Sequence, residues 1–570
     1  MSNPETSRSL WHQLLEAKIS RRGALKGGLV LAGASTLPLN VLAAGEVPAG
    51  SHGGTQGLVA RSLPPFQPIA PTSADDLVLP PGYRYNVVRI YGDEVAPGQP
   101  FGYNADFIGY FPIDWLEGGQ SSYDGLLWVN HEYTNPMLQY GYSGGPKSVE
   151  QIAIERNSVG GSIFRVQRQK DGRWSFVADG HNRRVTGFTT CRLTGPAVGA
   201  AALKGATQVM GSVGNCAGGV TPWGTVLSCE ENVDEYGAAV EKGGSGWDES
   251  YVAMHQGWVV EVDPYNPEHT PVKHTAMGRM RHENVAVRAS AGRPVACYMG
   301  DDKQDSCIYK YVTFGVYNPD DRAANLPLLE AGKLYAADFS SGKWIRIDYD
   351  TQAALQAATR SDGSPLFGSQ ADVVADARAA ALALKATPVD RPEDIEIHPS
   401  SSDVYGSLTN NALHGNYHGQ IIRIRETDNN PESETFQWDF FATGGPQSGF
   451  SSPDKLVFDA HGNLWMVTDI SSSSIGKGIY KFQGNNAMFF FSTEGPNAGK
   501  AMQFASGPVQ CEMTGPYWTP DGSTLFVSVQ HPGEDSKSLQ ELTSHWPNLN
   551  GDPLPRPGVV AITGFPGWGA

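Results

Sequence analysis

The chain contains 570 residues, of which 40% are hydrophobic and 18% are charged, with 67 glycines and 39 prolines. This length allows two to four ordinary domains or one large architecture of repeats, and the abundance of glycine and proline favours many short strands over long helices. The formal net charge of −17 argues against a nucleic-acid backbone as a partner, because phosphates and surplus acidic groups repel each other.

The N-terminal region has the features of an export signal. Residues 20–44 read SRRGALKGGLVLAGASTLPLNVLAA, in which the twin arginine Arg21-Arg22 precedes a weakly apolar run that ends in two alanines. This pattern resembles a twin-arginine signal, although Ala24 stands where the pattern prefers phenylalanine. We expect residues 1–44 to be a signal peptide recognised by the twin-arginine translocase, which moves folded proteins. The alternative is a cytoplasmic N-terminal helix with a chance arginine pair.

The sequence that follows the signal bears on the location of the mature protein. Residues 45–74 begin with the glycine-rich stretch GEVPAGSHGGTQG and are expected to form a flexible leader. No later segment is long and apolar enough to cross a bilayer. We therefore expect a protein of the periplasm or the extracellular medium, with no membrane span once the signal is removed.

Six stretches of the remaining chain share one template. Each begins with an acidic residue or a cysteine, passes through an apolar strand and a turn with Gly, Asp or Ser, and ends a second strand in polar residues, as in DKLVFDAHGNLWMVTD. Each stretch reads as a β-hairpin. Their spacing suits blades with insertions and predicts an all-β, six-bladed β-propeller over residues 75–570 with loop and short helical insertions. The alanine-rich residues 351–389 predict one helical insertion. A two-sheet sandwich is the alternative.

The propeller prediction brings the leading residues of the six hairpins together, because the first strand of every blade lines the central channel. These residues would form one ring: Asp106, Cys216, Glu283, Glu393, Asp454 and Glu512. A second set lies at the ends of the strands that follow: Glu132, Glu230, Glu231, Asp301, Asp302, Asn410, Asp469 and His531. So many carboxylates in one funnel would repel each other without cations, so bound multivalent metal is expected.

The residue types in the predicted ring indicate more than one kind of metal. Carboxylates and amides are the hard oxygen donors that suit Ca²⁺ or Mg²⁺. The thiolate of Cys216 is a soft ligand that suits iron or zinc, so the ring predicts a mixed cluster. Arg391 lies two residues before Glu393, and a guanidinium in a metal-rich site typically holds an anion such as phosphate.

Several motifs together resemble the PhoX-type alkaline phosphatases. They include WVNHEYTNP, NCAGGVTPWGTVLSCEEN, WVVEVDPYNP and RHENVAV, and the resemblance runs from about residue 75 to the C-terminus. It implies hydrolysis of phosphate monoesters outside the cytoplasm by a six-bladed propeller. It also implies a cluster of two Fe³⁺ and three Ca²⁺ ions with a bridging oxo group and a cysteine ligand to iron.

The resemblance assigns roles to individual positions. Cys216 resembles the iron ligand, Glu283 and Glu393 resemble ligands of the cluster metals, and Arg391 resembles an arginine that contacts phosphate. Arg391, Glu393 and Glu283 are therefore the predicted catalytic residues. The predicted metal ligands are Cys216, Glu230, Glu231, Glu283, Glu393, Asp454, Glu512, Asp302, Asp469 and Glu132. The region after Glu231 is shorter than in many relatives, which affects the rim of the site.

Two other functions remain open at this point. A calcium-dependent propeller hydrolase of lactones or organophosphate triesters would need no iron and would have a mainly apolar funnel. A non-catalytic exported propeller would bind a partner and use its channel acids for structural calcium only. In every case a closed propeller can stand alone, so a monomer is expected.

Overall fold

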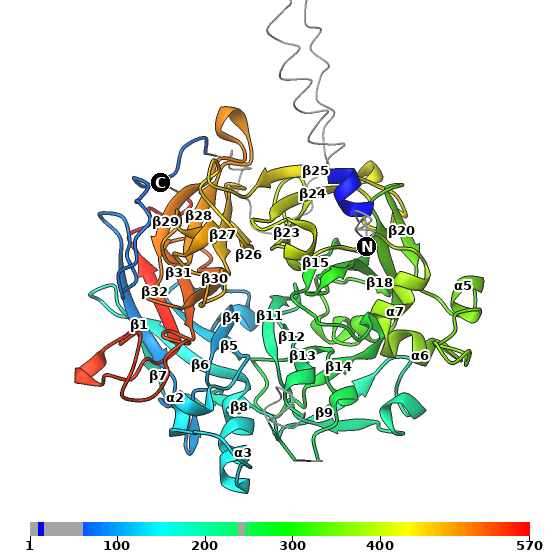
Figure 1. The fold of residues 1–570 in the computed structure, drawn as a ribbon, viewed down its shortest axis with the longest axis horizontal. Helices are drawn as coiled ribbons and strands as arrows, with labels where there is room; N and C mark the ends of the chain where they lie inside the picture. The colour runs from blue at the N-terminus through cyan, green and yellow to red at the C-terminus, as the bar shows by residue number, and fades with distance from the viewer. Residues whose placement is uncertain (1–9, 16–60, 238–245, 249, 570) are drawn as a thin grey trace, which may run out of the picture.

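The computed structural model describes residues 10–15, 61–237, 246–248 and 250–569, and these form the predicted six-bladed β-propeller (Figure 1). Each blade is a sheet of four to six strands, and the innermost strands of successive blades contact one another around the centre. Six sheets arranged in this way exclude the two-sheet sandwich. The innermost strands are β4 (Ala105–Pro112), β11 (Asn215–Val220), β15 (Ala286–Arg288), β22 (Pro392–Ile397), β26 (Pro453–Phe458) and β30 (Glu512–Trp518).

The outer strands complete the blades, and all but one of the pairings within the blades are antiparallel. Blade 1 adds β5 (Asp124–His131), β6 (Gly160–Arg168), β7 (Trp174–Val177) and β8 (Arg183–Val185). Blade 2 adds β12 (Val226–Glu230), β13 (Val259–Val262), β14 (Val272–His274), β9 (Thr190–Thr194) and β10 (Gln208–Met210). Blade 3 adds β16 (Pro294–Gly300), β18 (Ile308–Val316), β19 (Gly332–Asp338) and β20 (Lys343–Arg346). Blade 4 adds β23 (Val404–Leu408), β24 (Gln420–Glu426) and β25 (Phe436–Thr443). Blade 5 adds β27 (Leu464–Thr468), β28 (Ala487–Phe491) and β29 (Met502–Ser506).

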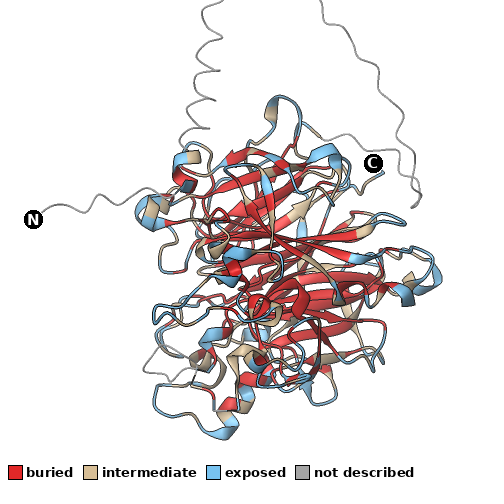
Figure 2. Ribbon diagram, turned by 90° about the vertical axis from the view of Figure 1, so that its right-hand side faces the viewer, coloured by how far each residue is buried: buried red, intermediate tan, exposed pale blue. Residues whose placement is uncertain are grey.

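Blade 6 closes the ring with strands from both ends of the chain. It contains β30, β31 (Thr524–Gln530) and β32 (Gly558–Thr563), and β1 (Arg84–Ile90) pairs with β32 in antiparallel orientation. This closure fastens the first strand of the domain to the last, so the ring cannot open without loss of that strand pair. Figure 2 shows the buried residues concentrated in the strands of the blades and the exposed residues in the connecting loops.

Short helices and two small ribbons lie in the connections between strands. Three helices occur between β20 and β22, within the segment expected to be helical: α5 (Ala353–Gln356), α6 (Gln370–Ala375) and α7 (Ala377–Ala383). Further helices are α2 (Pro136–Tyr140), α3 (Val149–Ser158) and α4 (Arg322–Asn325), and residues 10–15 are also helical. β2 (Glu94–Ala96) pairs with β3 (Gln99–Pro100), and β17 (Gln304–Ser306) pairs with β21 (Val389–Asp390). The β21 strand leads directly into Arg391.

The N-terminal part of the chain lies partly outside the described residues. Residues 16–60, which contain the twin arginine and the start of the expected leader, are among those not described. Residues 61–74 lie against blade 5, where Ile69 N donates to Gln503 O at 3.0 Å and the ring of Phe66 packs 4.9 Å from that of Phe504. Within the part of the chain that the structure describes, no helix is long and apolar enough to cross a membrane.

Candidate metal centre

Bulges in the innermost strands of four blades help to build the acidic ring predicted from the hairpins. In blades 1, 2, 4 and 5 the register between the first and second strands shifts just after the first residue of the innermost strand. A bulge re-aims the residues that it contains. The shifts lie at Asp106, Cys216, Glu393 and Asp454, each together with the residue that follows it. The bulges therefore direct these side chains to the channel instead of into the blade.

The ring residues approach closely enough to share metal ions. Three groups each offer one ligand atom per residue within 4.8 Å of the others: Asp106 with Glu132 and Cys216, Cys216 with Glu231 and Glu283, and Glu283 with Glu393 and Asp454. All of these residues are buried. Because Cys216 and Glu283 each belong to two groups, the three groups form one continuous row across the channel, which suits a cluster better than separate single-ion sites.

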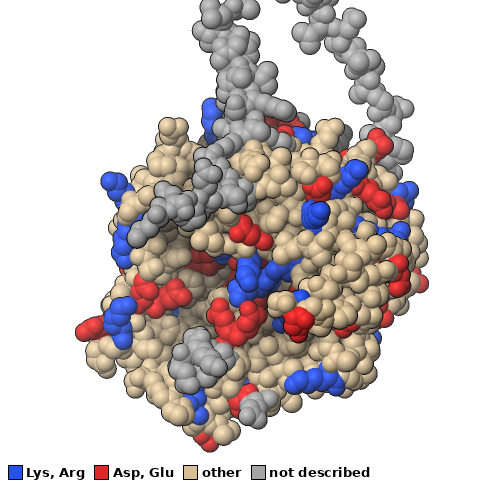
Figure 3. Space-filling model, turned by 45° about the vertical axis from the view of Figure 1, so that its right-hand side comes forward, with Lys and Arg blue, Asp and Glu red and all other residues tan. Residues whose placement is uncertain are grey.

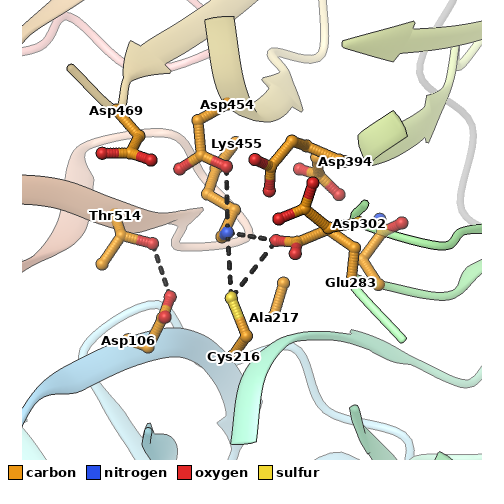
Figure 4. A network of polar contacts seen from close by, with 12 residues as sticks. Asp106, Cys216, Ala217, Glu283, Asp302, Asp394, Asp454, Lys455, Asp469 and Thr514 are labelled. Atoms are coloured by element: carbon orange, nitrogen blue, oxygen red, sulfur yellow. Dashed lines mark hydrogen bonds and ion pairs between the residues drawn. The ribbon is translucent and has the colours of Figure 1, made fainter. Parts of the chain in front are cut away.

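The thiol of Cys216 lies in the middle of this row (Figure 4). Its Sγ is 3.3 Å from Glu283 Oε1. Burial, followed by the charges of Asp106 and Glu132, raises the pKa of the Cys216 thiol well above its usual value. A bound cation has the opposite effect, since a metal-coordinated thiol is held as the thiolate. All six cysteines are free thiols, so no disulfide competes for this sulfur.

Two carboxylate oxygens of the row have no partner that offsets their burial. Among the described residues, Glu283 Oε2 and Asp454 Oδ2 are buried and lack a hydrogen-bond partner. Burial raises the pKa of Glu283 to about 7 and raises that of Glu393 well above its usual value. Buried, unpaired carboxylates are costly unless a cation satisfies them. The donor set, many carboxylate oxygens and one sulfur, fits a cluster that combines hard and soft metals.

Arg391 lies beside the row and is held by two carboxylates. Its Nε donates to Asp302 Oδ1 at 2.9 Å and its Nη2 donates to Asp302 Oδ2 at 2.7 Å, while Nη2 also lies 2.5 Å from Glu393 Oε1. Its Nη1 is 3.8 Å from Asp469 Oδ2, which is too long for a hydrogen bond. The backbone φ of Arg391 is +49°, a conformation that is strained for a side chain of this size. The two-point contact with Asp302 thus orients one remaining edge of the guanidinium toward the cavity.

The row opens into a polar cavity of about 450 Å³. Figure 3 shows acidic side chains gathered around basic ones in a hollow of the molecular face. Nearly all of the lining is polar or charged, and beyond the ring it includes Tyr133, Asn232, Ser471, Ser472, Ser473, His531 and Glu534. A polar funnel of this kind differs from the apolar funnel expected of a lactone or triester hydrolase.

Comparisons with known proteins agree with this geometry. The model of the family described as alkaline phosphatase PhoX matches residues 64–533. The chain belongs to the PhoX alkaline phosphatase family. Among solved structures, Pseudomonas fluorescens PhoX in complex with vanadate, a transition-state analogue, is 32% identical with a TM-score of 0.78, and the match covers 88% of this chain and 98% of that chain. The resemblance inferred from the sequence motifs is thereby confirmed.

The similarity to a second solved structure is weak. A Xanthomonas campestris gluconolactonase matches with 12% identity over 84% of this chain and 97% of that chain, with a TM-score of only 0.27. No curated protein sequence matches the chain.

Most of the metal ligands predicted from the sequence are brought together in this member of the PhoX family. Glu132, Glu231, Asp302, Asp469 and Glu512 line the same cavity as Cys216, Glu393 and Asp454, and Glu283 joins them through the row. Burial, followed by the charge of Asp454, raises the pKa of Glu512, as expected for acids crowded at one axis. Asp301 instead pairs with Arg378, outside the cavity lining.

Glu230 is the predicted ligand that the structure does not place in the row. Its Oε1 lies 2.7 Å from Lys273 Nζ, both side chains are fully buried, and its Oε2 accepts from Gly257 N at 2.9 Å. The reason is the alternation of a β-strand, in which consecutive side chains point to opposite faces. Glu230 ends β12 and points into the blade, whereas the next residue, Glu231, points to the channel.

This difference predicts opposite effects for two adjacent substitutions. Glu230→Gln should lower the free energy of unfolding by about 3 kcal/mol, because it leaves a buried ammonium without its carboxylate. The metal content of the Glu230→Gln variant should stay unchanged. Glu231→Gln should reduce the bound metal and disturb unfolding less. Thermal unfolding and elemental analysis of both purified variants check this, and metal loss in Glu230→Gln with none in Glu231→Gln would reverse the assignment.

One residue that contacts the row, Lys455, was not predicted from the sequence. Lys455 Nζ lies 3.2 Å from Cys216 Sγ and 3.0 Å from Asp454 Oδ1, and it also contacts Glu283 Oε1 (Figure 4). The same bulge that turns Asp454 to the channel directs Lys455 across the channel axis. Its buried ammonium offsets part of the negative charge of the row. The only signal for it in the sequence was a basic residue directly after a ring acid.

Proposed function

We propose that the chain is an exported alkaline phosphatase that hydrolyses phosphate monoesters at a mixed iron–calcium cluster in the propeller channel. The observation that carries the proposal is the row of acidic groups with Cys216 in its middle, beside an arginine held for anion binding. Cys216 would bind iron, and Glu283 and Glu393 would bind cluster metals. Glu132, Glu231, Asp302, Asp454, Asp469 and Glu512 would complete the ligand set for iron and calcium.

The proposed ion content is that implied by the family resemblance, two Fe³⁺ and three Ca²⁺ with a bridging oxo group. When bound, such a cluster supplies positive charge that polarises the oxygens of a phosphoryl group and stabilises charge in the transition state. Without that charge the carboxylates of the row could not all ionise in one buried place.

The protein's own residues have a separate part in the proposed reaction. Arg391 would bind the phosphoryl oxygens, and its two hydrogen bonds to Asp302 hold it in place before the substrate arrives. Such preorganisation avoids an entropic cost at the moment of reaction. The polar cavity of about 450 Å³ leaves room for a phosphate group with a small alcohol portion at the mouth.

The location of the enzyme is part of the proposal. The twin arginine Arg21-Arg22 and the run that follows it support export by the twin-arginine translocase to the periplasm or beyond the cell. A translocase that moves folded proteins suits an enzyme whose buried thiolate needs its metal before export. The closed ring needs no second copy to complete the site, which supports a monomer.

Removal of metal tests the proposed function. We expect iron and calcium together in the purified, folded protein, and a chromogenic phosphomonoester should be hydrolysed before chelation but not after it. Restoration of activity by both ions, and not by calcium alone, would support the mixed cluster. Calcium without iron, combined with no phosphatase activity, would instead favour the lactone or triester hydrolase or the non-catalytic binding protein.

A further inference from the structure

A short N-terminal helix packs on the propeller at blades 3 and 4. Residues 10–15 are helical, and Figure 1 shows them in blue beside β20 and β25. Trp11 is fully buried. Its ring stacks on that of Trp438 at 5.2 Å and meets the rings of Phe339 and Phe440 edge-on at 5.5 and 5.7 Å. An indole surrounded by three aromatic rings is a typical anchor of a specific interface.

A polar contact accompanies this anchor. His12 Nε2 lies 3.3 Å from Asp390 Oδ2, and its ring lies 4.7 Å from that of His414. Asp390 is itself positioned by Asn411 and Asn416, each of which donates to it at 2.9 Å. The helix therefore makes two different contacts, one with an aromatic pocket and one with the strand β21 that connects blades 3 and 4.

The aromatic pocket exists only when two blades have packed together. Phe339 follows β19 of blade 3, whereas Trp438 and Phe440 lie on β25 of blade 4. Trp438 Nε1 donates to Phe339 O at 2.9 Å across a sequence separation of 99 residues. A chain in which these blades are not yet packed has no such pocket, so a segment that binds the pocket binds only the folded propeller.

We infer that residues 10–15 form a docking segment that ties the expected signal peptide, residues 1–44, to the folded propeller, with Trp11 as its anchor in the pocket of Phe339, Trp438 and Phe440. The segment lies ahead of Arg21-Arg22 in the sequence. Docking makes the contact of the signal peptide with the domain depend on the packing of blades 3 and 4, and removal of the signal peptide uncovers the pocket. The link to export rests on the proposed twin-arginine signal, whereas the docking itself does not.

Side-chain footprinting of the full-length chain, with the signal peptide retained, tests the docking. In Trp11→Ala, hydroxyl radicals should oxidise Trp438 several-fold faster than in the unaltered chain, because the indole that covers it is gone. Leu10→Ala is the matched control, since Leu10 is 46% exposed on the same helix, and it should leave Trp438 protected. Trp465 of blade 5 is an internal standard. Equal protection of Trp438 in Trp11→Ala would overturn the proposal.

A double-mutant cycle gives an independent measure. Trp11→Ala and Trp438→Phe should each lower the midpoint of thermal unfolding of the full-length chain, and the double variant should lower it by less than the sum, as expected for residues in contact. Additive shifts would contradict the docking. Neither measurement involves a phosphate ester, so a failure of the docking proposal and a failure of the proposed phosphatase function are distinguishable.

Discussion

Cys216→Ala should retain the propeller, lose iron and lose at least about 10³-fold in the rate of phosphomonoester hydrolysis, since bound metal contributes several kcal/mol of transition-state stabilisation. The thiol belongs to two of the three ligand groups, so its loss affects the row on both sides. The fold should survive because alanine fills the same bulge of β11 without a new polar group. Iron content, circular dichroism and initial rates of the purified variant check the three parts of this expectation.

Cys229→Ala is the matched control for this result. Cys229 is also fully buried in the same blade, but it packs in an apolar cluster that includes Val259 and Cys297. Its removal should leave iron and activity in place and cost some stability through a small cavity. If Cys216→Ala keeps its iron, the thiol is not a ligand. If both variants lose iron equally, the loss reports general damage to the blade.

The inner ring could be predicted because hairpin repeats set its register. A turn and two apolar strands recur six times, and the first residue of each hairpin is therefore equivalent around the axis. The places of Asp106, Glu283 and Glu512 in the ring could be predicted from this periodicity alone. The family motifs then indicated which chemistry such a ring supports.

The remaining features depend on information that a linear pattern does not contain. A bulge adds one residue to a short strand and leaves its apolar pattern almost unchanged, so the place of Lys455 across the channel could not be read from DKLVFD. The opposite directions of Glu230 and Glu231 follow only once the end of β12 is known. Trp11 finds its pocket more than three hundred residues away, and nothing local marks it as buried.

Arg391→Lys should lower kcat for phosphomonoesters by about 10²-fold, comparable to the loss of one donor to a developing oxyanion. Lysine keeps the positive charge but has no planar fork, so it cannot bind Asp302 at two points and offer a further edge to the substrate. Arg391 contacts the carboxylates of Asp302 and Glu393 but is not itself a metal ligand. The calcium and iron content of the variant should therefore remain. Kinetics together with elemental analysis separate this effect from loss of the cluster.

Arg378→Lys is the matched control for Arg391→Lys. Arg378 makes the same kind of two-point contact with Asp301, the residue adjacent to Asp302, and its Nε donates to Asp301 Oδ2 at 2.7 Å. It does not line the cavity. The variant should therefore lose stability but keep kcat. A similar loss of kcat in both variants would mean that the arginine–aspartate pairs only support the loops, whereas a loss confined to Arg391→Lys locates phosphate binding at that guanidinium.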